Sequence, residues 1–225
     1  MMKTFRCVAA IASLYVAIIA AMPADKDGLI QVNLAEFPKY RAVLVKKLGS
    51  TRFDCGRVVF KPAFVPEYSV SVYSKTSKDQ YFATYIKAEQ NLNDLLEPGA
   101  DRKKAKLVKT RIVTCEMPRH IAEELRQAWI GMLSGKQHPR PMTLQDAVRA
   151  TDATVGEFSI QLPNETLYGE VLEAESPLGR KTTALVELAN MLIGYCQAEP
   201  THRPAIEHEI DRKATRLLEM LNKEL

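Results

Sequence analysis

The chain has 225 residues, of which 46% are hydrophobic and 26% charged, and its formal net charge is +4. This composition is typical of a globular protein and excludes a disordered or fibrous chain. So small a charge gives no indication of nucleic-acid binding, and it falls to about +2 (4 minus 2) when Lys3 and Arg6 are left out. The sequence contains no internal repeat and no low-complexity tract.

The first 24 residues have the layout of a secretory signal peptide. A short basic start precedes an uncharged run of about 16 residues, Cys7 to Met22, and charged residues follow from Asp25. A permanent membrane span needs nearer 20 apolar residues. We therefore expect residues 1–24 to be a signal peptide that touches the membrane transiently and residues 25–225 to form a single α+β domain. The product would be periplasmic or secreted. The alternatives are an uncleaved anchor and a buried helix of a cytosolic protein.

Export changes how the cysteines are interpreted. Three remain after removal of the signal segment: Cys55, Cys115 and Cys196. In an oxidising compartment two of the three could form a disulfide, and the spacing does not choose the pair. The alternatives are three small buried side chains or one reactive thiol.

The first half of the chain predicts one short helix and four strands. The helix is expected from about Leu34 to Leu48, because Pro38 fits a first turn and Gly49 follows the last apolar residue. The runs 57–64, 68–73, 80–89 and 104–115 are rich in β-branched and aromatic residues and predict an antiparallel meander. Pro62 and Pro66 cannot donate to a ladder, so the first strand should lie at an edge or be bulged.

Helical spacing returns after Pro118. We expect helices near 119–134, 180–198 and 204–224, the second capped by Thr182 or Thr183. Between the first two, residues 155–162 and 166–173 predict a hairpin. The fold class is therefore α+β, an antiparallel sheet of four to six strands packed on one face by three helices. Trp129 lies on the apolar stripe of the first of these helices, which predicts a place in the core.

Several short segments occur in this order along the chain: Pro62-x-Phe64-x-Pro66-Glu67, Ala128 to Leu133, Gly156-Glu-Phe158, and a Ser176-Pro177 loop before Leu185-Val186-x-Leu188-Ala189. Over residues 55–198 this pattern resembles a loose group of small exported bacterial α+β proteins without an assigned activity. Asp152-Ala153 stands where an Asp-Gly turn would complete the likeness. The resemblance implies export and an α+β fold, and it implies no chemistry.

Few residues suggest catalysis or metal binding. The sequence lacks the motifs of nucleophilic hydrolases, and Cys115 and His120 are near one another only along the chain. Glu67, at a strand entrance, would suit a general acid or base or a turn that it stabilises. His208 and Asp211 share a helix face, near His202, but zinc needs further ligands. We expect no catalytic residue, no metal site and no cofactor.

A basic run is the best candidate for a binding site. No acidic residue interrupts it, and it lacks the aromatic residues that would stack on nucleic-acid bases. Its members are Arg102, Lys103, Lys104, Lys106, Lys109 and Arg111. The run would suit an acidic protein or an anionic component of the envelope, or it keeps a solvated strand edge soluble.

These observations favour a non-catalytic binding module of the bacterial envelope, comparable to an inhibitor or an immunity protein. An envelope hydrolase with a dispersed active site, using Glu67 and His120, is one alternative. A structural envelope protein is the other.

Overall fold

The computed structural model describes residues 27–33, 38–49, 52–75, 79–92, 107–138, 154–172 and 178–223. The predicted signal peptide, residues 1–24, lies outside these ranges.

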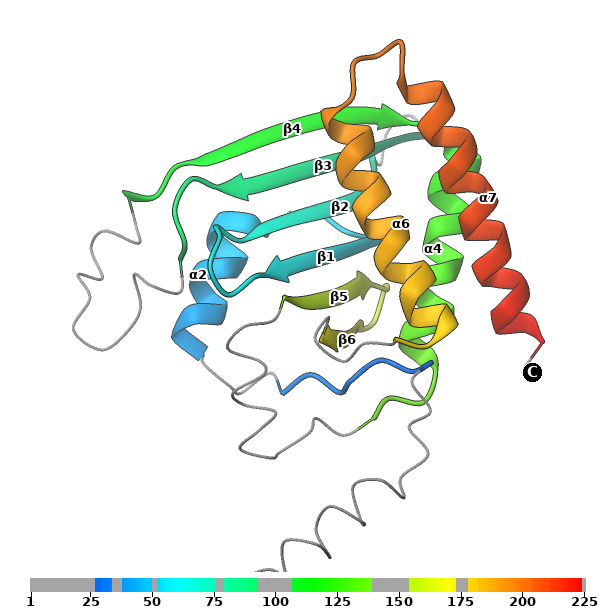
Figure 1. Cartoon of the computed structure of the whole chain (residues 1–225), viewed down its shortest axis with the longest axis horizontal. Helices are drawn as coiled ribbons and strands as arrows, with labels where there is room; N and C mark the ends of the chain where they lie inside the picture. Colours follow the sequence, from blue (N-terminus) through cyan, green and yellow to red (C-terminus); the bar gives the residue numbers. More distant parts are fainter. Residues whose placement is uncertain are drawn as a thin grey trace, which may run out of the picture.

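Six antiparallel strands form one open sheet in the order β4-β3-β2-β1-β5-β6 (Figure 1). The strands are β1 (Gly56–Lys61), β2 (Tyr68–Lys75), β3 (Gln80–Ala88), β4 (Thr110–Met117), β5 (Val155–Gln161) and β6 (Thr166–Leu172). The predicted α+β class and the predicted number of strands are confirmed. The fourth strand begins later than expected, at Thr110 and not near residue 104.

The prediction that the first strand lies at an edge or is bulged at its prolines is wrong. β1 is central and pairs with β2 on one side and β5 on the other. The strand ends at Lys61, so Pro62 and Pro66 fall in the connection to β2. No ladder bond is required there, and the missing N–H groups of the two prolines therefore cost the sheet nothing.

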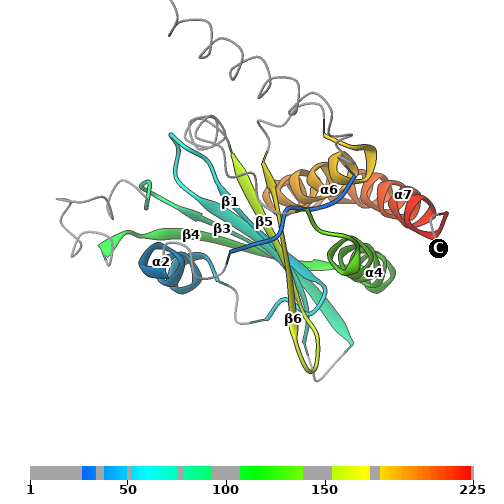
Figure 2. The same cartoon turned by 90° about the horizontal axis from the view of Figure 1, so that it is seen from below.

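Three helices cover one face of the sheet in two layers (Figure 2). α4 (Arg119–Ser134) and α6 (Arg180–Gln197) contact the strands, and α7 (Arg203–Asn222) packs on the outer side of both. The core between them includes Trp129, which is 1% exposed, as its place on the apolar stripe predicted. The expected cap of α6 is wrong, because the helix begins after Gly179 and Thr182 is buried inside its first turns.

A fourth helix, α2 (Pro38–Leu48), covers part of the opposite face of the sheet (Figure 2). Its Leu44 and Leu48 pack against Val59 of β1 and Ile86 of β3, with Val108 beside them. These apolar residues are grouped on a face that is otherwise polar, and their burial explains where α2 lies. The sequence predicted this helix but not that it would cover the second face.

Candidate functional site

A row of polar side chains crosses the whole sheet on the face that carries α2. Alternate residues of a strand point to the same face, and the strand register sets one residue of each strand opposite the next. The six residues of this polar row, in strand order from β4 to β6, are Thr114, Thr84, Ser71, Arg57, Ser159 and Tyr168. Hydroxyl groups thus flank a single cation near the middle of the sheet.

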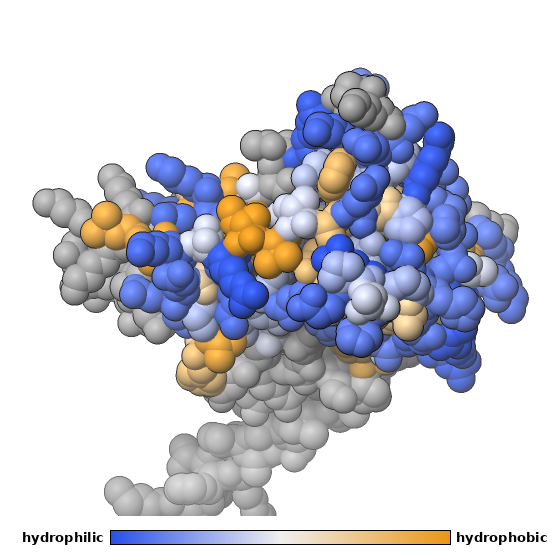
Figure 3. All heavy atoms as spheres, turned by 90° about the horizontal axis from the view of Figure 1, so that it is seen from above, coloured by the Kyte–Doolittle hydropathy of each residue, from blue (hydrophilic) through white to orange (hydrophobic). Residues whose placement is uncertain are grey.

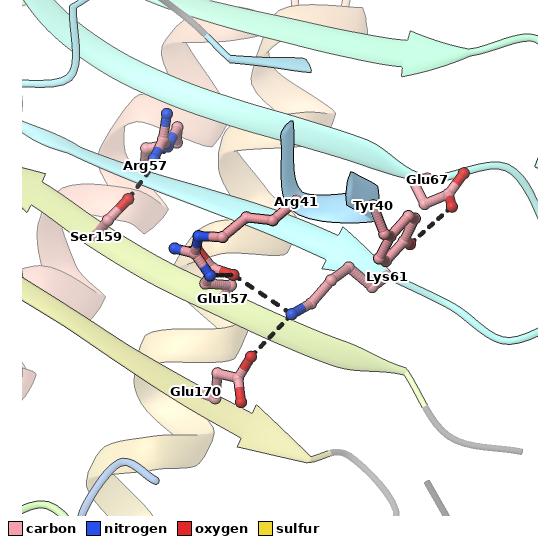
Figure 4. A network of polar contacts seen from close by, with 8 residues as sticks. All are labelled: Tyr40, Arg41, Arg57, Lys61, Glu67, Glu157, Ser159 and Glu170. Atoms are coloured by element: carbon pink, nitrogen blue, oxygen red, sulfur yellow. Dashed lines mark hydrogen bonds and ion pairs between the residues drawn. The ribbon is translucent and has the colours of Figure 1, made fainter. Parts of the chain in front are cut away.

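Arg57 is the buried cation of the polar row. It is 6% exposed, and its Nε donates to Ser159 Oγ at 3.1 Å (Figure 4). Its guanidinium carbon lies 3.9 Å from the ring centre of Phe53. Burial lowers the pKa of Arg57, and the charge of Glu157 acts in the opposite direction. Among the described residues no carboxylate forms an ion pair with Arg57. Its charge is therefore stabilised by a hydroxyl group, by an aromatic ring and, without direct contact, by the negative charge of Glu157.

Beside the polar row, four charged side chains form a network that ties α2 to the sheet (Figure 4). Both carboxylate oxygens of Glu157 accept from Arg41 of α2, at 2.6 and 3.0 Å, and Lys61 Nζ lies 3.4 Å from the same carboxylate. Lys61 also donates to Glu170 at 2.8 Å. Glu157 and Glu170 are 6% and 5% exposed. The sequence analysis missed this network, although two glutamates inside apolar strands were a signal for it.

Glu67, a candidate acid or base from the sequence, is fully buried and braces two connections. Its Oε1 accepts from the hydroxyl of Tyr40 at 2.7 Å, and its Oε2 accepts from the backbone N–H of Leu92 at 2.7 Å. A carboxylate with 0% exposure cannot reach a substrate from solvent, so this geometry suits a structural role. His120, the second candidate for a hydrolase, is exposed on α4 and lies 3.8 Å from Asp211 of α7.

The basic run is described only in part. Arg102, Lys103, Lys104 and Lys106 lie outside the described residues. Lys109 and Arg111 are exposed, Lys109 just before β4 and Arg111 within it. Arg111 stands directly opposite Lys87 of β3, another exposed cation, whereas the neighbour of Lys109 is the acidic Glu89, which follows the end of β3.

β4 is an edge strand whose outer backbone groups can be identified from the ladder. Glu89 N donates to Lys109 O at 3.0 Å, so the backbone groups of Lys109 point toward β3. Since the direction alternates along an antiparallel strand, the N–H and C=O groups of Thr110, Ile112 and Thr114 point outward. Further along, Glu116 O lies 2.6 Å from the hydroxyl of Tyr195, so α6 covers that end of the edge.

The other edge of the sheet is covered. Ile30 pairs with Glu170 of β6 through two backbone hydrogen bonds of 2.8 Å. Among the described residues, no comparable segment pairs with Thr110, Ile112 or Thr114 of β4. Within the described ranges the two edges of the sheet therefore differ, because a segment pairs with β6 and none pairs with the outward groups of β4.

Exposed apolar side chains accompany the open edge of β4. Ile112 is 60% exposed and Leu107, just before the strand, is 77% exposed. Figure 3 views the molecule from the side of β4 and shows hydrophobic atoms exposed among hydrophilic ones. Proteins usually blunt an edge strand with charged side chains, so an exposed isoleucine in the middle of this strand needs an explanation.

Cys115 and His120, which are close in the sequence, lie in different surroundings. Cys115 of β4 and Cys196 of α6 have sulfur atoms 3.6 Å apart, whereas Cys55 is buried beside α4. Cys115 is therefore next to a second thiol, and His120 is exposed on another surface. The part of the chain that the structure describes holds no group of three metal-binding side chains.

In the described ranges, no helix combines the length and the apolar character that a membrane crossing requires. No protein-family model, no curated protein and no solved structure matches this chain.

Proposed function

We propose that this protein is a non-catalytic binding module of the bacterial envelope, and that β4 pairs with an extended acidic segment of a partner protein. The observation that carries the proposal is the difference between the two edges of the sheet. Ile30 covers β6, and no described segment covers Thr110, Ile112 or Thr114 of β4. An open edge of this kind binds an extended peptide as an additional strand.

The side chains of β4 support binding of a protein segment. Backbone hydrogen bonds supply affinity in this mode, and alternate side chains supply specificity. The added strand would cover Ile112, which is 60% exposed. It would also partly cover the hydroxyl groups of Thr110 and Thr114. Covering the isoleucine removes apolar surface from water and favours association.

The charges near β4 support an acidic partner. Lys87 and Arg111 stand directly opposite each other on neighbouring strands, and like charges in that position repel. Among the described residues, Lys109 adds a third cation near this pair, with the acidic Glu89 beside Lys109 and Glu116 further along β4. A carboxylate of the added strand beside Arg111 would offset this repulsion, and the attraction would raise the rate of association.

The location in the envelope rests on the first segment of the sequence, a basic start followed by an uncharged run. Cell fractionation tests it directly. The expected result is a product in the periplasm or the medium that is shorter than the full chain by about two dozen residues. A full-length product in the cytosol would contradict the envelope location. It would not decide whether β4 binds a partner segment, which has a separate test.

The binding test uses two variants of one residue. Affinity capture from an envelope extract first supplies a partner, whose affinity is then measured by calorimetry. Ile112→Pro removes an outward N–H without removing a bond to β3, and Ile112→Val keeps both the N–H and an apolar side chain. We expect Ile112→Pro to weaken binding about tenfold or more, the value of one lost hydrogen bond, and Ile112→Val to change it little.

Charge reversal tests the acidic character of the partner segment. Arg111→Glu is expected to weaken binding and to make it less sensitive to salt. Arg216→Glu, a reversal on the exposed side of α7, is the matched control and should leave affinity unchanged. If Ile112→Pro and Arg111→Glu both bind the captured partner as tightly as the wild-type protein, the β4 edge is not the binding surface.

A further inference from the structure

Two buried thiols meet where the edge strand β4 passes under α6. Cys115 Sγ lies 3.6 Å from Cys196 Sγ, and the two residues are 81 positions apart in the chain. They are 4% and 1% exposed. The disulfide bond length is about 2.05 Å, so the sulfur atoms would have to approach by about 1.5 Å, a movement that side-chain rotation can supply.

We propose that Cys115 and Cys196 are a disulfide-forming pair, a modification site that fixes the edge strand β4 to helix α6. The proposal rests on which thiols the fold brings together. Cys55 has no such neighbour among the described residues, because it lies on the side of α4, where Asp54, Glu123 and Arg126 surround it. The pairing does not depend on a partner binding to β4.

The surroundings of the pair favour the reaction of one thiol before the other. The hydrogen bond to Cys196 is the main cause that lowers the pKa of Cys115, and the charge of Arg203 acts in the same direction. The same hydrogen bond and burial raise the pKa of Cys196. Once Cys115 loses its proton, the Cys196 thiol, which holds its own proton more tightly, can donate a hydrogen bond to the Cys115 thiolate, so Cys115 is the first nucleophile.

Arg203, at the start of α7, contributes a positive charge to this environment. Its guanidinium lies 5.7 Å from the ring centre of Tyr195, and its Nε is buried without a hydrogen-bond partner among the described residues. Glu207, which lies 2.8 Å from the Tyr195 hydroxyl, opposes the effect of Arg203 on Cys115. The thiol pair thus lies beside a partly desolvated cation, the setting in which thiolates form.

The chemistry is thiol–disulfide exchange with an external disulfide, either a small molecule or an oxidoreductase. The Cys115 thiolate attacks one sulfur of that disulfide, forms a mixed disulfide and releases the other sulfur as a thiolate. Cys196 then loses its proton and attacks Cys115 Sγ, and the second thiolate leaves. The protein loses two protons and two electrons, and the external disulfide is reduced to two thiols. Cys115 becomes accessible when the edge strand opens locally.

The test starts from the full chain reduced with dithiothreitol and then equilibrated with oxidised glutathione. Free thiols are blocked by alkylation, and the digested protein is mapped by mass spectrometry before and after reduction. We expect one linked peptide pair, Cys115 with Cys196, and complete alkylation of Cys55. Cys55→Ala should form the same link, and its urea midpoint should rise on oxidation as that of the wild-type protein does.

Two results would overturn the proposal. One is a linked pair that contains Cys55. The other is full alkylation of Cys115 and Cys196 under conditions that oxidise a short dithiol peptide in the same tube. Both readouts come from the wild-type chain, so the conclusion does not depend on whether Cys115→Ala or Cys196→Ala folds. Where those variants do fold, each should lose the rise in urea midpoint on oxidation.

Discussion

Glu157 Oε1 lies 2.6 Å from Nη2 of Arg41, a contact that joins β5 to α2 across 116 positions of the chain. Glu157→Gln removes the charge that both Arg41 and Lys61 face. Loss of one partner from a buried ion pair costs 3–5 kcal/mol, and the partial exposure of Arg41 reduces this to about 2–3 kcal/mol. Urea unfolding should show a decrease of that size in the free energy of unfolding.

Two further variants test whether this cost comes from the network. Arg41→Met should cost less than Glu157→Gln, because Glu157 keeps Lys61 as a partner. Glu209→Gln, which breaks the exposed pair with Arg212 on α7, should leave the urea midpoint unchanged. Equal midpoints for Glu157→Gln and the wild-type protein would show that the network does not hold α2 to the sheet.

We expect Glu67 to stabilise the folded protein. Glu67→Gln keeps the shape but replaces one accepting oxygen by a donor that faces either the Tyr40 hydroxyl or the Leu92 N–H. The expected cost is about 1–3 kcal/mol in the free energy of unfolding, since a buried donor is left without its acceptor. Tyr40→Phe removes the hydrogen bond to Glu67 Oε1, a loss that should cost about 1 kcal/mol. A Glu67→Gln protein as stable as the wild type would reopen the role of Glu67 as an acid or base.

Helices were easier to predict from the sequence than tertiary neighbours. The apolar stripe through Leu125, Trp129 and Leu133 repeats at helical spacing, and such local periodicity sets an amphipathic helix without reference to the rest of the chain. The place of β1 in the sheet was mispredicted because Pro62 was counted within the strand, which ends one residue earlier. The predicted run ended three residues late, at residue 64 and not at Lys61, and this error moved the strand from the centre to the edge.

Contacts between distant residues could not be predicted in this way. Arg41 meets Glu157, and Cys115 meets Cys196, only because α2 and α6 cross particular strands. The crossing points depend on how the core packs, and no pattern within one segment encodes them. The difference between the two edges of the sheet could not be predicted either. The Ile30 segment, which covers the edge at β6, has no strand periodicity in its sequence.

Cys55 should make stability depend on alkaline pH. Burial, assisted by the negative charge of Asp54, raises the pKa of Cys55 from 9.0 to about 12. The folded protein keeps this proton in a range where the unfolded chain loses it, so stability is complete below pH 9 and falls as the pH rises toward 12. The contribution of one group is about 1.4 kcal/mol for each pH unit in that range.

The measurement is a series of urea titrations, with dithiothreitol present, on the wild-type protein and Cys55→Ala. Burial also raises the pKa of Tyr195, so both proteins should lose stability in this range. The wild-type curve should fall more steeply, and the difference between the two isolates Cys55. Parallel curves would mean that the Cys55 thiol ionises in the folded protein as readily as in the unfolded chain.

Two glycines should respond in opposite ways to alanine. Gly56, at the start of β1, has a φ of 127°, a backbone conformation that residues with a side chain rarely adopt. A Cβ added there would lie 2.8 Å from the ring of Trp129. Backbone strain of about 1–3 kcal/mol and overpacking of about 1–3 kcal/mol both oppose Gly56→Ala.

Gly194 is exposed within α6, and an added Cβ would meet nothing within 4 Å. Gly194→Ala should therefore stabilise the protein by up to about 1 kcal/mol, the difference in helix propensity. Thermal unfolding of both variants checks the pair: a lower midpoint for Gly56→Ala and a raised one for Gly194→Ala are expected. An unchanged midpoint for Gly56→Ala would mean that Trp129 and the backbone at the start of β1 can move apart, and that the packing of α4 on the sheet is looser than its buried residues indicate.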